Sequence, residues 1–142
     1  MTTLAAAYKD LKVLVIDDQD TFRLTISIML EYLGVPTIVE ADSGATGYDQ
    51  LLRHKPDVVL CDMHMTPMDG QEFLRKAREA ADPAVRDVAM IFLSGDNQLD
   101  TVRGAMRHHA DGYLVKPFEV EDLKQQLDIT VTILGARRKA AR

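Results

Sequence analysis

Five short runs rich in Val, Ile and Leu, separated by stretches with helical spacing, constrain the fold of this chain most. The runs are Lys12–Ile16, Thr37–Glu40, Val58–Cys61, Val88–Leu93 and Gly112–Val115. Most of their positions are consecutively apolar, which is typical of strands buried on both faces of a parallel sheet. The alternation predicts an α/β fold, with helices on both faces of one sheet and right-handed crossovers between its strands.

The stretches between the runs carry apolar side chains at the three- and four-residue spacing of helices. In the first stretch these side chains are Phe22, Ile26, Leu30 and Leu33, which we interpret as core. The second helix is predicted to begin near Ser43, a suitable N-cap, and the third to follow Gly70, with a loop at Pro83. A fourth helix is predicted from Leu99, Val102 and Met106.

The last predicted helix has the longest apolar stripe. Its members are Val120, Leu123, Leu127, Val131 and Leu134. They either dock on the sheet or extend past it as a short coiled-coil seam for a partner helix, and we favour docking. The basic residues Arg137, Arg138, Lys139 and Arg142 follow this helix. We expect them to complement the negative end of the helix dipole and to remain solvated in a frayed tail.

Size, charge and cysteine content limit the classes of function. The 142 residues suffice for one globular domain with one core. A net charge of −5 argues against direct binding to nucleic acid, which clustered Lys and Arg would favour. Cys61 is the only cysteine, so neither an internal disulfide nor a cysteine-based zinc cluster is expected. No apolar run approaches the roughly 20 residues of a membrane span, and we expect a cytoplasmic protein.

Polar side chains follow four of the five predicted strands. Asp17 and Asp18 follow the first strand, Asp62 the third, Ser94 the fourth and Lys116 the fifth. In open parallel sheets, ligands bind beyond the carboxyl ends of the strands. The sequence therefore predicts that three carboxylates, one hydroxyl and one ammonium group converge at this edge of the sheet.

Carboxylates brought this close repel one another unless a cation neutralises them. Mg²⁺ is the expected cation, because it takes oxygen ligands and commonly binds one or two carboxylates together with phosphate oxygens. Asp62 stands alone at the end of the central strand, so it is the candidate nucleophile that would form an acyl phosphate. Lys116 would neutralise charge on the phosphoryl oxygens, and Ser94 would donate a hydrogen bond to one of them.

Each of these residues, taken alone, also has an ordinary structural explanation. An aspartate after a strand often caps a helix, which would account for Asp18 or Asp20, and a lysine is usually a solvated charge. A phosphoryl-binding site is favoured because all five groups are predicted at the carboxyl ends of strands in the same sheet.

Four segments resemble the motifs of receiver domains of two-component response regulators. VLVIDDQDTFR resembles the acidic-pair strand of that family, VVLCDMHMTPMDGQEFL its phosphoacceptor segment, IFLSGD its switch-hydroxyl strand and ADGYLVKPF its lysine segment. Their order and spacing also agree, and the resemblance covers residues 11–134, with 1–10 and 135–142 as terminal extensions. It implies a (βα)5 flavodoxin-like fold with strand order 2-1-3-4-5.

The resemblance implies a role for each acidic residue. Asp62 would be the phosphoacceptor. Asp18, Asp62 and the backbone carbonyl of His64 would bind Mg²⁺ directly, and Asp17 would help through water. Lys116 would bind the phosphoryl group.

The resemblance also implies a switch. Ser94 and Tyr113 would move together on phosphorylation, the alternative for Tyr113 being a half-buried aromatic at the sheet edge. The Lys116–Pro117 bond would be cis. One departure from the family pattern is Thr66, which stands where a proline is common, with Pro67 one position later.

Partners follow from the same resemblance. A sensor histidine kinase or a histidine phosphotransfer protein would supply the phosphoryl group, and an unidentified downstream protein would bind the switched form. The usual output face of the family would include Asp100, Arg103, Arg107, Glu119 and Glu121. A homodimer through the fourth and fifth helices is a further hypothesis.

The leading hypothesis is a response regulator that catalyses only its own phosphorylation and dephosphorylation. One rival is a Mg²⁺-dependent phosphatase that forms a covalent aspartyl phosphate. It is disfavoured because Asp62 does not begin an Asp-x-Asp pattern and no inserted cap would enclose a small substrate. The other rival is an interaction module that acts without phosphorylation, which the complete acidic, hydroxyl and lysine set disfavours.

Overall fold

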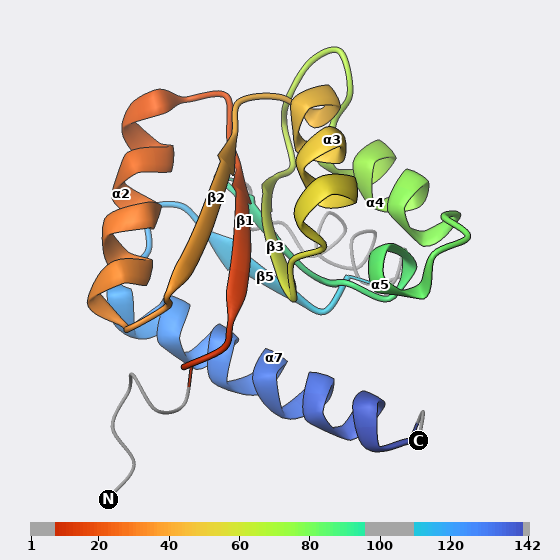
Figure 1. Ribbon diagram of the computed structural model, residues 1–142. Helices are drawn as coiled ribbons and strands as arrows, with labels where there is room; N and C mark the ends of the chain where they lie inside the picture. Colours follow the sequence, from red (N-terminus) through yellow and green to blue (C-terminus); the bar gives the residue numbers. More distant parts are fainter. Residues whose placement is uncertain (1–7, 96–109, 141–142) are drawn as a thin grey trace, which may run out of the picture.

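A single parallel sheet organises the chain, whose computed structural model describes residues 8–95 and 110–140 (Figure 1). Its strands are β1 (Lys12–Ile16), β2 (Thr37–Ala41), β3 (Val58–Asp62), β4 (Ala89–Ser94) and β5 (Gly112–Val115). They lie in the order β2-β1-β3-β4-β5, with every neighbouring pair parallel. The predicted doubly wound α/β fold and its strand order are confirmed.

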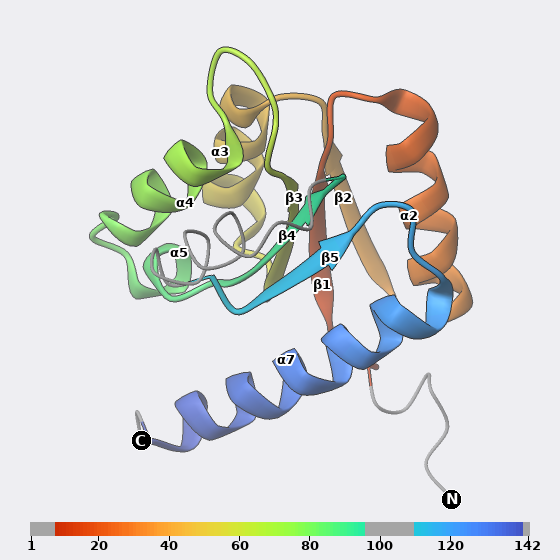
Figure 2. The same cartoon turned by 180° about the vertical axis from the view of Figure 1, so that it is seen from behind.

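Helices cover both faces of this sheet. They are α2 (Asp20–Tyr32), α3 (Gly44–His54), α4 (Gly70–Arg78), α5 (Pro83–Arg86) and α7 (Val120–Ala140). Helices α2 and α7 lie on one face, and α3, α4 and α5 lie on the other (Figures 1 and 2). The predicted fourth helix lies outside the described residues, as do Asp100, Arg103 and Arg107 of the expected output face.

The sheet separates two apolar layers, because successive strand residues point to opposite faces. In β1, Val13 and Val15 join the layer under α2 and α7, whereas Leu14 and Ile16 join the layer under α3 and α4. The same alternation continues in β3 and β4, whose residues are all buried. Burial on both faces explains why these strands read as continuous apolar runs in the sequence.

Two loop predictions had different outcomes. Ser43 caps α3 as predicted: its hydroxyl accepts a hydrogen bond from the Thr46 amide, and the Thr46 hydroxyl accepts one from the Ser43 amide. The prediction of a loop at Pro83 is wrong, since Pro83 begins the four-residue helix α5. The first residues of a helix have no intrahelical partner for their amide hydrogens, so a proline, which lacks this hydrogen, is tolerated there. Asp82 caps the turn, since its carboxylate accepts a hydrogen bond from the Ala84 amide.

Helix α7 docks on the sheet, as favoured from its stripe. Leu123, Leu127 and Leu134 are buried. The expectation of a frayed basic tail is wrong for Arg137 and Arg138, because α7 continues through Ala140. Their guanidinium groups form ion pairs with Asp111 and Asp57, respectively. These pairs hold the last turn of α7, which lies beyond its last buried apolar residue, Leu134.

The Asp111 carboxylate, just before β5, links α7 and α4 to the amino-end edge of the sheet through hydrogen bonds and ion pairs. Its side chain is only 5% exposed. One carboxylate oxygen accepts from the Met90 amide at 2.8 Å and from Arg78 at 3.3 Å, and the other accepts from Arg137 at 2.5 Å. Arg78 also donates to the backbone carbonyls of Arg86 and Val88. Burial lowers the pKa of Arg78, and the charge of Asp111 opposes that effect.

Tyr8 anchors the start of the described chain under α7. Tyr8 is 1% exposed within the apolar layer, and its hydroxyl donates a hydrogen bond to Asp128 of α7. Burial and then Asp128 raise the pKa of Tyr8. Within the ranges that the structure describes, no helix is both long enough and apolar enough to cross a membrane.

Candidate functional site

The three predicted carboxylates meet at the carboxyl-end edge of the sheet. Ile16 of β1 pairs with Cys61 of β3, so the next residues, Asp17 and Asp62, emerge side by side. Asp18 follows in the same turn. Carboxylate oxygens of Asp17, Asp18 and Asp62 all lie within 4.8 Å of one another. Parallel register therefore brings together residues that are 44 to 45 positions apart.

Burial makes this cluster chemically unusual. Asp17 is fully buried and Asp62 is 5% exposed, whereas Asp18 faces solvent. Burial raises the pKa of Asp62, and the charges of Asp17 and Asp18 add to the rise. The charge of Lys116 and a hydrogen bond from the His64 amide oppose it. A second positive charge would stabilise the ionised form further.

Lys116 extends from the β5–α7 connection into this cluster. Its ammonium nitrogen lies 3.0 Å from Oδ2 of Asp17 and 3.6 Å from Oδ1 of Asp62. The lysine side chain is only 15% exposed. It also lies over the ring of Phe22, 4.3 Å from the ring centroid. The Lys116–Pro117 bond is cis, as predicted, and the structure has a second cis bond at Thr66–Pro67.

The sequence interpretation missed Arg23, which holds the turn between β1 and α2. Its guanidinium donates to the backbone carbonyl of Asp17 at 2.6 Å, to Asp20 at 2.6 Å and to Glu40 of β2 at 3.2 Å. The Asp17 carboxylate also accepts from the Gln19 amide at 2.9 Å. Asp20 therefore pairs with an arginine, and neither it nor Asp18 caps α2. Glu40 lies 17 positions after Arg23 and approaches it only in the folded chain. Local sequence spacing therefore could not indicate this ion pair.

Gly70 is a second missed residue of this edge. A Cβ atom at Gly70 would lie 2.7 Å from the backbone oxygen of Asp62 and 2.9 Å from the Phe92 ring. Its amide donates to the Met63 carbonyl. Such a close approach of backbone to backbone requires glycine, and the Asp69–Gly70 pair after the strand was the available signal.

Ser94 and Tyr113 lie on the neighbouring strands β4 and β5. Ser94 is fully buried as the last residue of β4, and its carbonyl accepts from the Lys116 amide at 2.7 Å. Tyr113 pairs with Phe92 in the sheet and is half-buried against the layer that contains α3 and α4. The structure thus places Ser94 at the end of the strand next to β3 and Lys116 directly after β5, whereas Tyr113 lies within β5, two strands from Asp62.

The donor set of the cluster fits Mg²⁺. Asp17, Asp18 and Asp62 offer only carboxylate oxygens, and two of them are buried. Hard oxygen ligands suit Mg²⁺, whereas zinc sites usually include histidine or cysteine. His64 is exposed, and its amide rather than its ring contacts Asp62. The prediction that the His64 carbonyl is a metal ligand stays a prediction.

Fold and site together define a doubly wound α/β domain with an acidic, lysine-containing cluster at its carboxyl-end edge. Residues 13–128 match the response regulator receiver domain, and the chain belongs to this family. This match confirms the resemblance seen in the four sequence motifs. Receiver domains are the response elements of two-component signalling.

Chemotaxis proteins are among the similar relatives. Chemotaxis protein CheY-3 of Vibrio cholerae is 31% identical over 120 residues, which cover 84% of this chain and 91% of CheY-3. Chemotaxis protein CheY of Pseudomonas aeruginosa is 30% identical over 118 residues, which cover 83% of this chain and 94% of that protein. The structure of CheY4 of Vibrio cholerae superimposes with a TM-score of 0.77 at 26% identity, over 84% of this chain and 98% of CheY4. The chain is therefore a CheY-like receiver domain.

Proposed function

We propose that this receiver domain accepts a phosphoryl group on Asp62 and binds a partner protein differently afterwards. The observation that carries the proposal is the position of Asp62, which is buried, lies within 4.8 Å of two further carboxylates and is 3.6 Å from the Lys116 ammonium group. The donor would be a phosphohistidine of a sensor histidine kinase or of a histidine phosphotransfer protein. The family supports this class of donor.

The proposed transfer exchanges one bond to phosphorus for another. An oxygen of the Asp62 carboxylate forms a bond to phosphorus while the bond between phosphorus and the donor imidazole breaks. The bonding electron pair goes to the imidazole nitrogen, which takes up a proton. Mg²⁺ held by Asp17, Asp18 and Asp62 would neutralise charge on the phosphoryl oxygens. The backbone amide of His64 holds one oxygen of Asp62, at 3.3 Å, in a defined orientation.

Lys116 would exchange partners during this reaction. Its ammonium group pairs with Asp17 and Asp62 in the described structure. A phosphoryl group on Asp62 would carry about −1.5 to −2 charges at pH 7, in place of the single negative charge of the carboxylate, and would attract the ammonium to its oxygens. We propose that the Ser94 hydroxyl donates to the same group, and that Tyr113 turns as the switch. The chain would act in the cytoplasm on an unidentified partner, with a homodimer as one form of output.

Two other functions use the same geometry. A phosphatase would turn over external phosphate esters through the aspartyl phosphate, and an interaction module would bind partners with no phosphorylation at all. We propose that the chain catalyses only its own phosphorylation and dephosphorylation, because the family consists of signalling domains. Repeated turnover of small phosphate esters would support the phosphatase instead.

Intact mass measured after incubation with acetyl phosphate tests the proposal. The wild type should gain one acid-stable, base-labile phosphoryl group only when Mg²⁺ is present. Asp62→Asn should gain none, while Asp42→Asn, which changes an exposed carboxylate beyond β2, should behave as the wild type. No adduct on the wild type, with acetyl phosphate or with a phosphorylated histidine kinase, would refute the proposal.

A further inference from the structure

We infer that Phe22 is a positioning residue for Lys116: the face of its ring holds the lysine ammonium group beside the proposed phosphoacceptor Asp62. This inference rests on the proposed function. The Lys116 ammonium has carboxylates at 3.0 and 3.6 Å and the Phe22 ring at 4.3 Å. Those two types of contact restrain a side chain that would otherwise move freely on its four-carbon stem.

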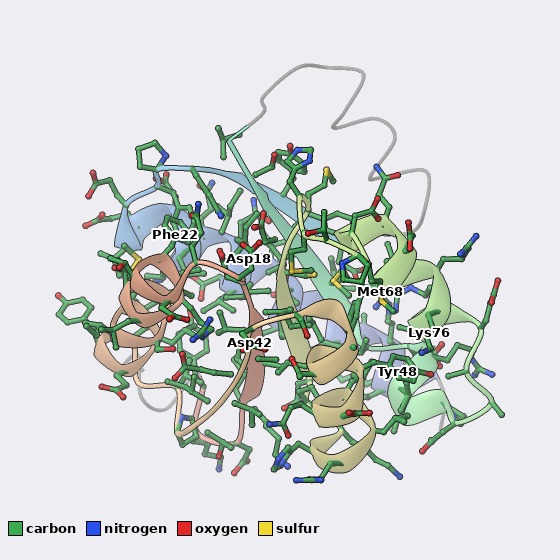
Figure 3. All side chains as sticks on the ribbon, turned by 90° about the horizontal axis from the view of Figure 1, so that it is seen from above. Asp18, Phe22, Asp42, Tyr48, Met68 and Lys76 are labelled. Carbon is green, nitrogen blue, oxygen red and sulfur yellow. The ribbon has the colours of Figure 1, made fainter. Side chains whose placement is uncertain are left out.

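Phe22 is itself held in orientation. Phe118, two residues after Lys116, meets the Phe22 ring edge to face, with centroids 5.8 Å apart and planes at 83°. This geometry is favoured for aromatic pairs, since the positive edge of one ring meets the negative face of the other. Phe22 thereby connects the first turn of α2, beside the acidic pair, to the loop that carries the lysine. Figure 3 shows Phe22 on the same side of the molecule as Asp18.

Low exposure strengthens the contact between the ring and the cation. A cation over an aromatic face is attracted by the ring quadrupole, more strongly where water is excluded. Lys116 is 15% exposed, and Phe22 is half-buried against the apolar layer. If Phe22 were an ordinary core residue, as its helical spacing alone suggests, an aliphatic side chain of similar volume would replace it without effect on the lysine.

The molecule contains a matched pair elsewhere. Lys76 lies over the Tyr48 ring at 4.2 Å, and Phe73 meets Tyr48 edge to face at 6.2 Å and 79°. Tyr48 belongs to α3 and Lys76 to α4, and Figure 3 shows both on the opposite side of Asp18 from Phe22. Lys76 is exposed, and among the described residues the ion pairs of the acidic cluster are made by Lys116 instead. The same type of contact between a lysine and an aromatic ring therefore occurs once beside the acidic cluster and once away from it.

The first test varies the charge on the ring face at nearly constant volume. Phenylalanines with one, two and three fluorine atoms are placed at position 22, and the phosphorylation rate with acetyl phosphate and Mg²⁺ is measured. The rate should fall stepwise with each fluorine, and Phe22→Leu should lose about 3- to 30-fold. Phe22→Trp should retain the wild-type rate or exceed it. Tyr48→Leu should leave the rate unchanged.

The second test needs no phosphorylation. Unfolding is measured for the wild type, Phe22→Leu, Lys116→Met and the double variant, and the cycle isolates the coupling between the two side chains. We expect coupling equivalent to about a 3- to 30-fold change in the unfolding equilibrium constant. Coupling below about twofold, or fluorinated variants that react as the wild type does, would overturn the inference. Coupling without any phosphorylation of the wild type would instead overturn the proposed function and leave the contact established.

Discussion

Replacing Asp111 with alanine should destabilise the domain more than any change to its exposed ion pairs. The substitution removes the acceptor of the buried Met90 amide and one partner of the Arg78 guanidinium. An unsatisfied buried amide costs about 1–3 kcal/mol, and a buried ion pair that loses one partner costs about 3–5 kcal/mol. Arg78 keeps its two carbonyl acceptors, so we expect a total near the lower bound of the sum, about 4 kcal/mol.

Urea denaturation followed by circular dichroism measures this loss. The midpoint should fall while the slope with denaturant stays constant, since the surface exposed on unfolding is the same. Asp111→Asn keeps an acceptor for the Met90 amide and should lose about half as much. Asp87→Ala removes a pair with Arg86 in which both side chains are about half exposed, and it should lose less than about 1 kcal/mol. Equal losses for Asp111→Ala and Asp87→Ala would refute the reasoning.

Four further substitutions test other parts of the fold. Tyr8→Phe removes the hydrogen bond to Asp128 and should cost about 1 kcal/mol at pH 7. Because burial raises the Tyr8 pKa, the wild type should lose stability relative to this variant as pH rises above about 10, and denaturation at pH 8 to 11 measures the difference. Gly70→Ala should cost about 1–3 kcal/mol and slow phosphorylation, because its Cβ would meet the Asp62 carbonyl, whereas Gly135→Ala in the open face of α7 should stabilise by about 0.5–1 kcal/mol. Ser43→Ala should cost about 1 kcal/mol in thermal denaturation through loss of the α3 cap.

Sequence reasoning succeeded where a local pattern is tied to a regular structure. The runs at 12–16 and 112–115 match β1 and β5 at both ends. In β3 and β4 the strand continues one residue further than predicted, so Asp62 and Ser94 end the strands rather than follow them. Parallel ladders continue through a polar residue when its backbone still has a partner, and side-chain polarity alone cannot show this.

Contacts between distant segments were beyond sequence reasoning. Nothing in the spacing of Phe22 distinguished a core residue from one that also contacts Lys116. Arg137 was assigned to a solvated tail, because its partner Asp111 lies 26 positions earlier. In both cases the pairing depends on how α2 and α7 pack on the sheet, which follows from tertiary structure and leaves no periodic signal.

The sheet divides the core into two layers, and this division determines which substitutions can be combined independently during evolution or engineering. Among the described residues, the buried apolar side chains under α2 and α7 and those under α3 and α4 form two separate clusters, since the backbone of the sheet lies between them. Substitutions in different layers should therefore combine with nearly additive free energies, while neighbours within one layer compensate each other. A library that repacks around Leu51 and Leu74 could be screened without reoptimising the partners of Leu30 and Leu127.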